Sequence, residues 1–301
     1  MSTIPLRPLG FGEVVDGALQ LYRRDFGLYY LIALLAAVPG YILLLVTGAD
    51  ATMLAADPGT DPVAMLGEMG VALVAIVFAA VMTWVGTVAV AVAMAERIEE
   101  RPVSVGRSYR ETLRHLPRAA GASILAFVLF GFVAAVLIAV AFAVMASFVL
   151  SGSIALTLIG GLGLFVVGAA LTMFWLAATF GILPAVIIEG RGVIGALQRS
   201  LGLCRGGWLR VTGIMVVAMI IRTAPSVAIM VLFGMQDMFT SPEALGTVDA
   251  ETQWLMNTAT LLIGPLTVPF MVGSIMMLFH DRRVRSEAYD LETLAGTMDA
   301  P

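Results

Sequence analysis

The sequence predicts an all-α, polytopic membrane protein, and three observations indicate this fold class. Of its 301 residues, 60% are hydrophobic and only 13% are charged, whereas a soluble protein is about half apolar and a quarter charged. Residues 119–188 contain no Asp, Glu, Lys or Arg, although about twenty apolar residues are enough for one helix to cross a bilayer. The third observation is that the arginines gather in alternate loops, as described below.

Runs of about twenty apolar residues predict six membrane helices. The third and fourth runs are longer than one crossing requires, so tilt or kinks are expected to absorb the excess. Pro184 is expected to break the fourth helix, because proline removes a helical hydrogen bond. Twenty-seven residues that include Glu13, Asp16 and Asp25 precede the first run, unlike the short basic start of a signal peptide, so we interpret this run as an uncleaved helix. The six runs are 28–47, 70–95, 119–150, 154–188, 209–235 and 254–279.

The side on which each loop lies is predicted by its arginines. Sixteen of the seventeen arginines fall before the first run, between the second and third, between the fourth and fifth, or after the sixth. The remaining loops contain no arginine, and the two longer ones carry only acidic charges. By the positive-inside rule, both termini are expected in the cytoplasm, which requires an even number of crossings.

The arginine-rich segments that lead into each new pair of helices resemble one another. Each contains a short amphipathic stretch. The apolar positions Val15, Val105 and Ile194 recur at intervals of 90 and 89 residues. Such a fixed period is typical of a duplicated unit. We therefore expect three repeats of an interfacial amphipathic helix plus two membrane helices, in a single domain over 1–286 with repeat units 8–97, 98–189 and 190–280, followed by a disordered tail over 287–301.

Two of the predicted membrane helices carry a small residue at every fourth position, at 75–95 and at 131–147. Small residues let membrane helices approach closely, so both stripes are expected to be packing seams. A pore lining is the alternative, but neither stripe contains a charged residue.

Arginines of the amphipathic segments are the candidate contacts for lipid headgroups or for a partner. A guanidinium group binds phosphate through two parallel hydrogen bonds. Two interpretations stay open: the arginines anchor the protein to lipid phosphates, or they form a collar that selects an anionic headgroup or docks a cytoplasmic protein. The candidates are Arg23, Arg24, Arg107, Arg110, Arg114, Arg118, Arg199, Arg205 and Arg210.

Arg222 is the one ionisable residue expected within the hydrocarbon. It follows Arg210 by twelve residues, which is about 18 Å of helix. A charge at this depth costs roughly 2.5 to 3.5 kcal/mol, so it normally faces protein or water. Arg222 is therefore a candidate intramembrane contact for an anion. Alternatively, its side chain extends towards the acidic loops or bonds backbone carbonyls near Pro225.

Catalytic and metal-binding patterns are not found in the sequence. Cys204 is the only cysteine, and the two histidines, His115 and His280, fit no metal-binding spacing. The formal net charge of −4 argues against nucleic acid as a partner. We therefore expect a protein that is not an enzyme and that has no cofactor and no metal.

Four segments resemble the membrane domain that precedes the catalytic domain of some bacterial glycerophosphodiester phosphodiesterases. They are PLGFGEVVDGALQLYRRDFG, RPVSVGRSYRETLRHLPR, LPAVIIEGRGVIGALQRSLGLCRGGWLR and LFHDRRVRSEAYDLE. Where that family commonly has Tyr-Tyr-Asp, this chain reads Phe279, His280, Asp281. Only twenty residues follow Asp281, too few for the phosphodiesterase barrel, so we expect no counterpart here of that enzyme's catalytic residues.

The resemblance implies a multi-pass protein of the bacterial plasma membrane. Together with the arginine pattern, it favours a non-enzymatic membrane module that organises anionic lipid or a partner protein at the cytoplasmic face. The alternative function is a transporter or permease for a small anionic or lipid-derived solute, with Arg222 as the anion contact. The oligomeric state is not predicted.

Overall fold

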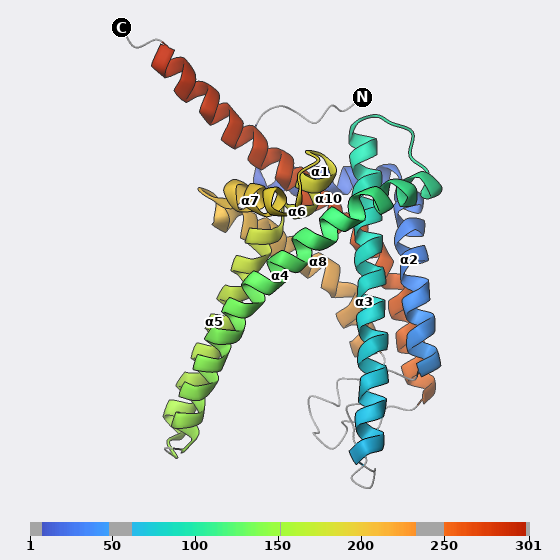
Figure 1. Ribbon diagram of the computed structural model, residues 1–301, viewed down its shortest axis with the longest axis vertical. Coiled ribbons are helices and arrows are strands. Elements are labelled where there is room, and N and C mark those ends of the chain that lie inside the picture. Colours follow the sequence, from blue (N-terminus) through green and yellow to red (C-terminus); the bar gives the residue numbers. More distant parts are fainter. Residues whose placement is uncertain (1–7, 48–61, 151, 233–249, 299–301) are drawn as a thin grey trace. The chain divides into compact units, whose positions relative to one another are not determined.

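The computed structural model describes residues 8–47, 62–150, 152–232 and 250–298. Every helix or strand assigned within these ranges is an α-helix, so the predicted all-α fold class is confirmed. The helices, shown in Figure 1, are α1 (Phe11–Arg24), α2 (Phe26–Thr47), α3 (Pro62–Ile98), α4 (Val105–Leu150), α5 (Ile154–Thr179), α6 (Ile182–Ile187), α7 (Val193–Cys204), α8 (Trp208–Leu232) and α10 (Ala250–Met298).

Six segments within the described ranges are long and apolar enough to cross a membrane. Each overlaps one of the six predicted runs, which confirms a polytopic membrane protein. The membrane segments are Phe26–Thr47, Leu66–Ile98, Val105–Leu150, Ala155–Ile187, Trp208–Ile229 and Trp254–Glu287.

The three amphipathic segments differ in how they join the membrane helices. α1 and α7 are separate helices, and each ends at a turn before α2 or α8 begins. Gly206, in the turn after α7, has a φ of +74°, a left-handed conformation that glycine adopts without strain. The second segment is instead the first part of α4 itself, because Pro117 lies inside this helix and does not interrupt it. The threefold repeat stays a prediction.

The end of α10 also differs from the expectation. The tail was expected to be disordered from residue 287, but α10 continues as a helix to Met298. Residues 287–295 contain no glycine or proline, and such a stretch lets a preceding helix propagate.

The chain forms two compact units, each built from segments that are distant in sequence. The first unit comprises residues 1–15, 115–216 and 275–301, and the second comprises residues 16–114 and 217–274. We describe each unit by itself.

In the second unit, α2 and α3 run side by side (Figure 1) because glycines allow their backbones to approach. A Cβ at Gly40 would lie 2.7 Å from the Cα of Ala79, and one at Gly86 would lie 2.8 Å from the Cβ of Ala36. Ala75, another member of the predicted small-residue stripe, is buried against α2. The predicted packing seam on this helix is therefore confirmed at Ala75 and Ala79.

In the first unit, α4 packs against α5 with a different face from the one predicted. The rings of Phe130 and Phe174 meet edge to face, with centroids 5.7 Å apart, and Gly160 lies against Phe148. The predicted stripe is mostly exposed within this unit. Aromatic side chains of α4 fill the α4–α5 interface in place of the small residues, so packing by this stripe stays a prediction. The exposed members of the stripe are Ala135, Ala139, Ala143 and Ser147.

The break expected near Pro184 is present between α5 and α6, at Phe180 and Gly181. A break leaves backbone groups without helical partners. The hydroxyl of Ser200, fully buried on α7, donates to the carbonyl of Ala178 at 2.7 Å and accepts from the Gly181 N–H at 3.0 Å. The Ser200 side chain therefore provides hydrogen-bond partners for a backbone group on each side of the break, and it holds α7 beside the break.

Candidate functional site

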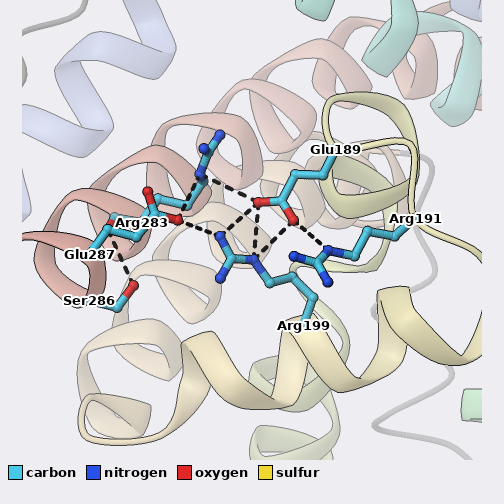
Figure 2. Close-up of polar contacts among 6 residues, drawn as sticks. All are labelled: Glu189, Arg191, Arg199, Arg283, Ser286 and Glu287. Atoms are coloured by element: carbon cyan, nitrogen blue, oxygen red, sulfur yellow. Dashed lines mark hydrogen bonds and ion pairs between the residues drawn. The ribbon is translucent and has the colours of Figure 1, made fainter. Parts of the chain in front are cut away.

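A network of arginines surrounds Glu189 in the first unit, where three elements meet (Figure 2). Glu189 follows α6, and Arg199 on α7 donates to its carboxylate from Nε at 3.0 Å and from Nη2 at 2.8 Å. The Nε of Arg191 donates to the same carboxylate at 2.8 Å, and the Nε of Arg283 on α10 lies 3.4 Å from it. Arg199 also donates to Glu287 at 2.6 Å. The network thus joins α10 to α7 and to the turn after α6.

The charges in this network change the ionisation of its members. Burial opposes the charged form of Glu189, but the hydrogen bonds from Arg199 and Arg191 outweigh it and lower the pKa of Glu189 below its usual value. Burial likewise opposes the charge on Arg199, yet its bonds to Glu189 and Glu287 raise the pKa of Arg199. The paired, charged state of both groups is therefore the stable one.

A second cluster of the same unit centres on Asp281, whose side chain is fully buried. Its carboxylate accepts hydrogen bonds from the backbone N–H of Leu9 at 2.8 Å, from Arg285 at 3.0 Å and from Arg210 at 3.2 Å. The carbonyl of Leu9 in turn accepts from Arg210 at 2.5 Å and from Arg285 at 2.7 Å. One buried carboxylate and two arginines thus hold both backbone groups of Leu9, just before α1.

Arg282, which lies between Asp281 and Arg283 in the sequence, caps the C-terminus of α7. Its guanidinium is buried and donates to the carbonyls of Leu203 at 2.7 Å and Arg205 at 2.8 Å. Carbonyls at the end of a helix lack partners and attract cations. A Cβ at Gly207 would overlap the Arg282 guanidinium, so the absence of a side chain there makes room for this cap.

Four of the nine predicted arginine contacts are occupied by internal carboxylates. Arg199 and Arg210 belong to the two clusters above. In the second unit, Arg107 pairs with buried Glu96 at 2.9 Å, and Arg114 pairs with Glu111 at 2.8 Å. These ion pairs contribute to the fold, and they reduce the positive charge that is available to an external anion.

The other five candidates are exposed and make no side-chain hydrogen bond or ion pair with any residue that the structure describes. Two of them lie near exposed apolar side chains in the sequence. Leu113, 68% exposed, is three residues from Arg110 on α4, and Trp208, 51% exposed, follows Arg205 at the start of α8. These five are Arg23, Arg24, Arg110, Arg118 and Arg205.

Arg222 lies on α8 in the second unit, with an exposed side chain. Its guanidinium forms no hydrogen bond or ion pair within the described ranges, and the hydroxyl of neighbouring Thr223 bonds the carbonyl of Met219 on its own helix. A role for Arg222 in contacting an anion stays a prediction.

Sequence reasoning missed Asp281, Arg282, Arg283 and Arg285 as a functional group. The available signal was the sequence HDRRVR directly after an apolar run. An acidic residue next to three arginines at a membrane boundary indicates internal pairing, because an isolated carboxylate would repel anionic headgroups.

The sequence profile of a family described as "Domain of unknown function (DUF7847)" matches residues 33–281, more than half of the chain. The protein belongs to the DUF7847 family. Comparisons with curated proteins and with solved structures return no match. The matched part of this DUF7847 protein contains Glu189, Arg199, Arg210 and Asp281, and it ends before Arg283 and Glu287. Within the described ranges of the DUF7847 protein, no group of three His, Cys, Asp or Glu residues lies close enough to hold a metal ion.

Proposed function

We propose that this DUF7847 protein is a non-enzymatic membrane module that binds anionic lipid headgroups at the cytoplasmic face of a bacterial plasma membrane. We also propose that the protein is related to the membrane domain of glycerophosphodiester phosphodiesterases, which its sequence resembles. The five exposed arginines without internal partners carry the argument, because their charge is available to an external anion.

The surroundings of these arginines favour lipid over a soluble anion. An arginine at the membrane boundary places its guanidinium among the phosphates while its stem and its apolar neighbours enter the acyl region. Trp208 beside Arg205, and Leu113 beside Arg110, fit this arrangement. Tryptophan in particular is enriched at the level of the headgroups. Each basic residue near an anionic surface contributes about 1 kcal/mol of attraction.

The orientation follows from charge. The arginine-rich segments are placed in the cytoplasm, together with both termini, by the positive-inside rule. The cytoplasmic leaflet is also the one whose anionic lipids attract basic segments, so the proposed ligand and the proposed orientation agree.

Lipid retention tests this function. The double variant Arg110→Gln with Arg205→Gln is purified in detergent containing equal amounts of phosphatidylglycerol and phosphatidylcholine, and bound lipids are counted by native mass spectrometry. We expect its preference for phosphatidylglycerol to fall by up to about thirtyfold, because two contacts of about 1 kcal/mol each are removed.

The matched control is Arg101→Gln with Arg114→Gln, which removes the same charge from arginines that already pair with Glu99 and Glu111. We expect this control to keep most of the preference. Equal losses in the two double variants, or no loss in either, would contradict specific headgroup binding by the unpaired arginines.

Arg222 carries a second candidate function, a transporter or permease for a small anionic or lipid-derived solute. Its exposed guanidinium has no partner among the described residues and is available to an anion. In proteoliposomes, Arg222→Gln would then abolish uptake of glycerol phosphate while Arg222→Lys retains part of it. Absence of uptake by the unmodified protein would exclude this function for that solute.

A further inference from the structure

The network around Glu189 contains more hydrogen-bond donors than its carboxylates use. Arg191 and Arg283 each engage only Nε, and Arg199 engages Nε and Nη2. The terminal nitrogens of Arg191 and Arg283, and Nη1 of Arg199, bond no described residue. Three positive charges therefore converge on two carboxylates with donors to spare, an arrangement that favours a further or a more highly charged anion.

The two carboxylates of the network are held unequally. Glu189 accepts bonds from Arg191 and from two nitrogens of Arg199, and its side chain is only 11% exposed. The side chain of Glu287 is 47% exposed and uses a single oxygen, which contacts Arg199 at 2.6 Å and Arg283 at 3.4 Å. Ion pairs that are this exposed contribute little free energy. Glu287 is therefore the carboxylate that can leave.

The position of Glu287 shows what could replace it. Its Oε1 and the Oε1 of Glu189 both contact Nη2 of Arg199 and Nε of Arg283. Two carboxylates that share the same donors repel each other. Glu287 lies beside Glu189 and the arginines (Figure 2). Its departure would relieve that repulsion and leave an arginine-lined position open beside the firmly held Glu189.

We propose that Arg191, Arg199 and Arg283 form a binding site for a phosphate group and that Glu287 occupies this site as a displaceable internal anion. A phosphate group offers more oxygens than a carboxylate and accepts paired bonds from guanidinium forks. The inference rests on the proposed function, for which it supplies a defined headgroup site and a side chain that regulates it. The phosphate can belong to a lipid headgroup or be free.

Titration of the detergent-purified full chain with inorganic phosphate, followed by ³¹P NMR, tests the site without lipid. Glu287→Gln removes the competing charge but keeps the shape of the side chain, so phosphate should bind about fivefold more tightly, since an exposed pair is worth up to about 1 kcal/mol. Arg283→Gln in the same background should reverse the gain. Arg283 is partly exposed and has only long contacts to carboxylates, so this change is expected to leave the fold intact.

Glu111→Gln is the matched control, because it also removes a carboxylate from an exposed pair with arginine but lies outside the network. It should leave phosphate affinity unchanged. In a second arm, native mass spectrometry counts the phosphatidylglycerol retained by the same variants. A gain for Glu287→Gln in the phosphate arm supports a site open to free phosphate, and a gain in the lipid arm alone supports a headgroup site.

No gain in either arm, a gain matched by Glu111→Gln, or a gain that survives Arg283→Gln would overturn the site. Failure of the proposed function is distinguishable from these results. It would appear as unchanged lipid retention in the double variant of Arg110 and Arg205, which leaves the network around Glu189 intact.

Discussion

Asp281 is the residue whose removal should cost this protein the most stability. Its buried carboxylate holds Arg210, Arg285 and the backbone of Leu9. Asp281→Asn leaves two guanidinium groups without their anion, and breaking a buried pair in this way costs about 3 to 5 kcal/mol. Thermal unfolding in detergent should show a lower midpoint, with Glu111→Gln as a control that costs less than about 1 kcal/mol. Equal effects of the two changes would contradict the assigned importance of Asp281.

Glu189 should make stability depend on pH in acid. Its pKa is lower in the folded protein than in the unfolded chain, because the bonds from Arg199 and Arg191 outweigh burial. The resulting stabilisation is present above the unfolded pKa of about 4.3 and is lost as the pH falls through the lower folded value. The stability advantage of the native protein over Glu189→Gln should therefore be constant above about pH 5 and shrink below about pH 4. An advantage independent of pH over this range would contradict the interpretation.

At the residue scale, the sequence predicted which arginines lie near the membrane boundary but not which of them are neutralised. Arg110 and Arg205 were candidates and are unpaired, whereas Arg199 and Arg210 were candidates and are paired internally. The difference arises because Asp281 and Glu287 reach these arginines from a distant segment, and spacing along the chain carries no information on such contacts.

At the scale of elements, the break between α5 and α6 depends on a side chain from α7. Ser200→Ala removes the hydroxyl that joins Ala178 to Gly181, leaving two buried backbone groups unsatisfied at about 1 to 3 kcal/mol. We expect faster hydrogen exchange at Gly181 and a lower unfolding midpoint. Ser147→Ala is the control, since that hydroxyl is exposed and bonds only Val144 of its own helix. Unchanged exchange at Gly181 in Ser200→Ala would show that another group supports the break.

Proline predicted the place of this break but not its support. Pro184 lies within α6, whereas the preceding helix, α5, ends five residues before it, at Thr179. Pro39 and Pro225 also lie inside helices, yet α2 and α8 continue through them. A proline weakens a helix wherever it occurs, and the break forms where a neighbour such as Ser200 satisfies the freed groups.

At the scale of the whole molecule, the predicted topology can be tested with single cysteines. Cys204, the only native cysteine, is buried and is first replaced by alanine. Asp57→Cys lies in an arginine-free loop of the sequence, and Glu99→Cys lies between α3 and α4. A membrane-impermeant maleimide should label the first in intact cells and the second only after permeabilisation. The reverse pattern would contradict both termini being cytoplasmic.

The sequence by itself determined that this is an α-helical protein of six membrane segments, with all but one of its arginines at the termini or in alternate loops. Hydropathy and charge are local properties that add along the chain, so they can be read without the fold. The tertiary structure alone decided which arginines remain free. The Leu9 N–H donates to Asp281, which lies 272 positions away in the sequence, and Arg210 donates to Asp281 from 71 positions away. Such pairs form only when distant segments fold together, so the charge offered to an external anion is a property of the fold.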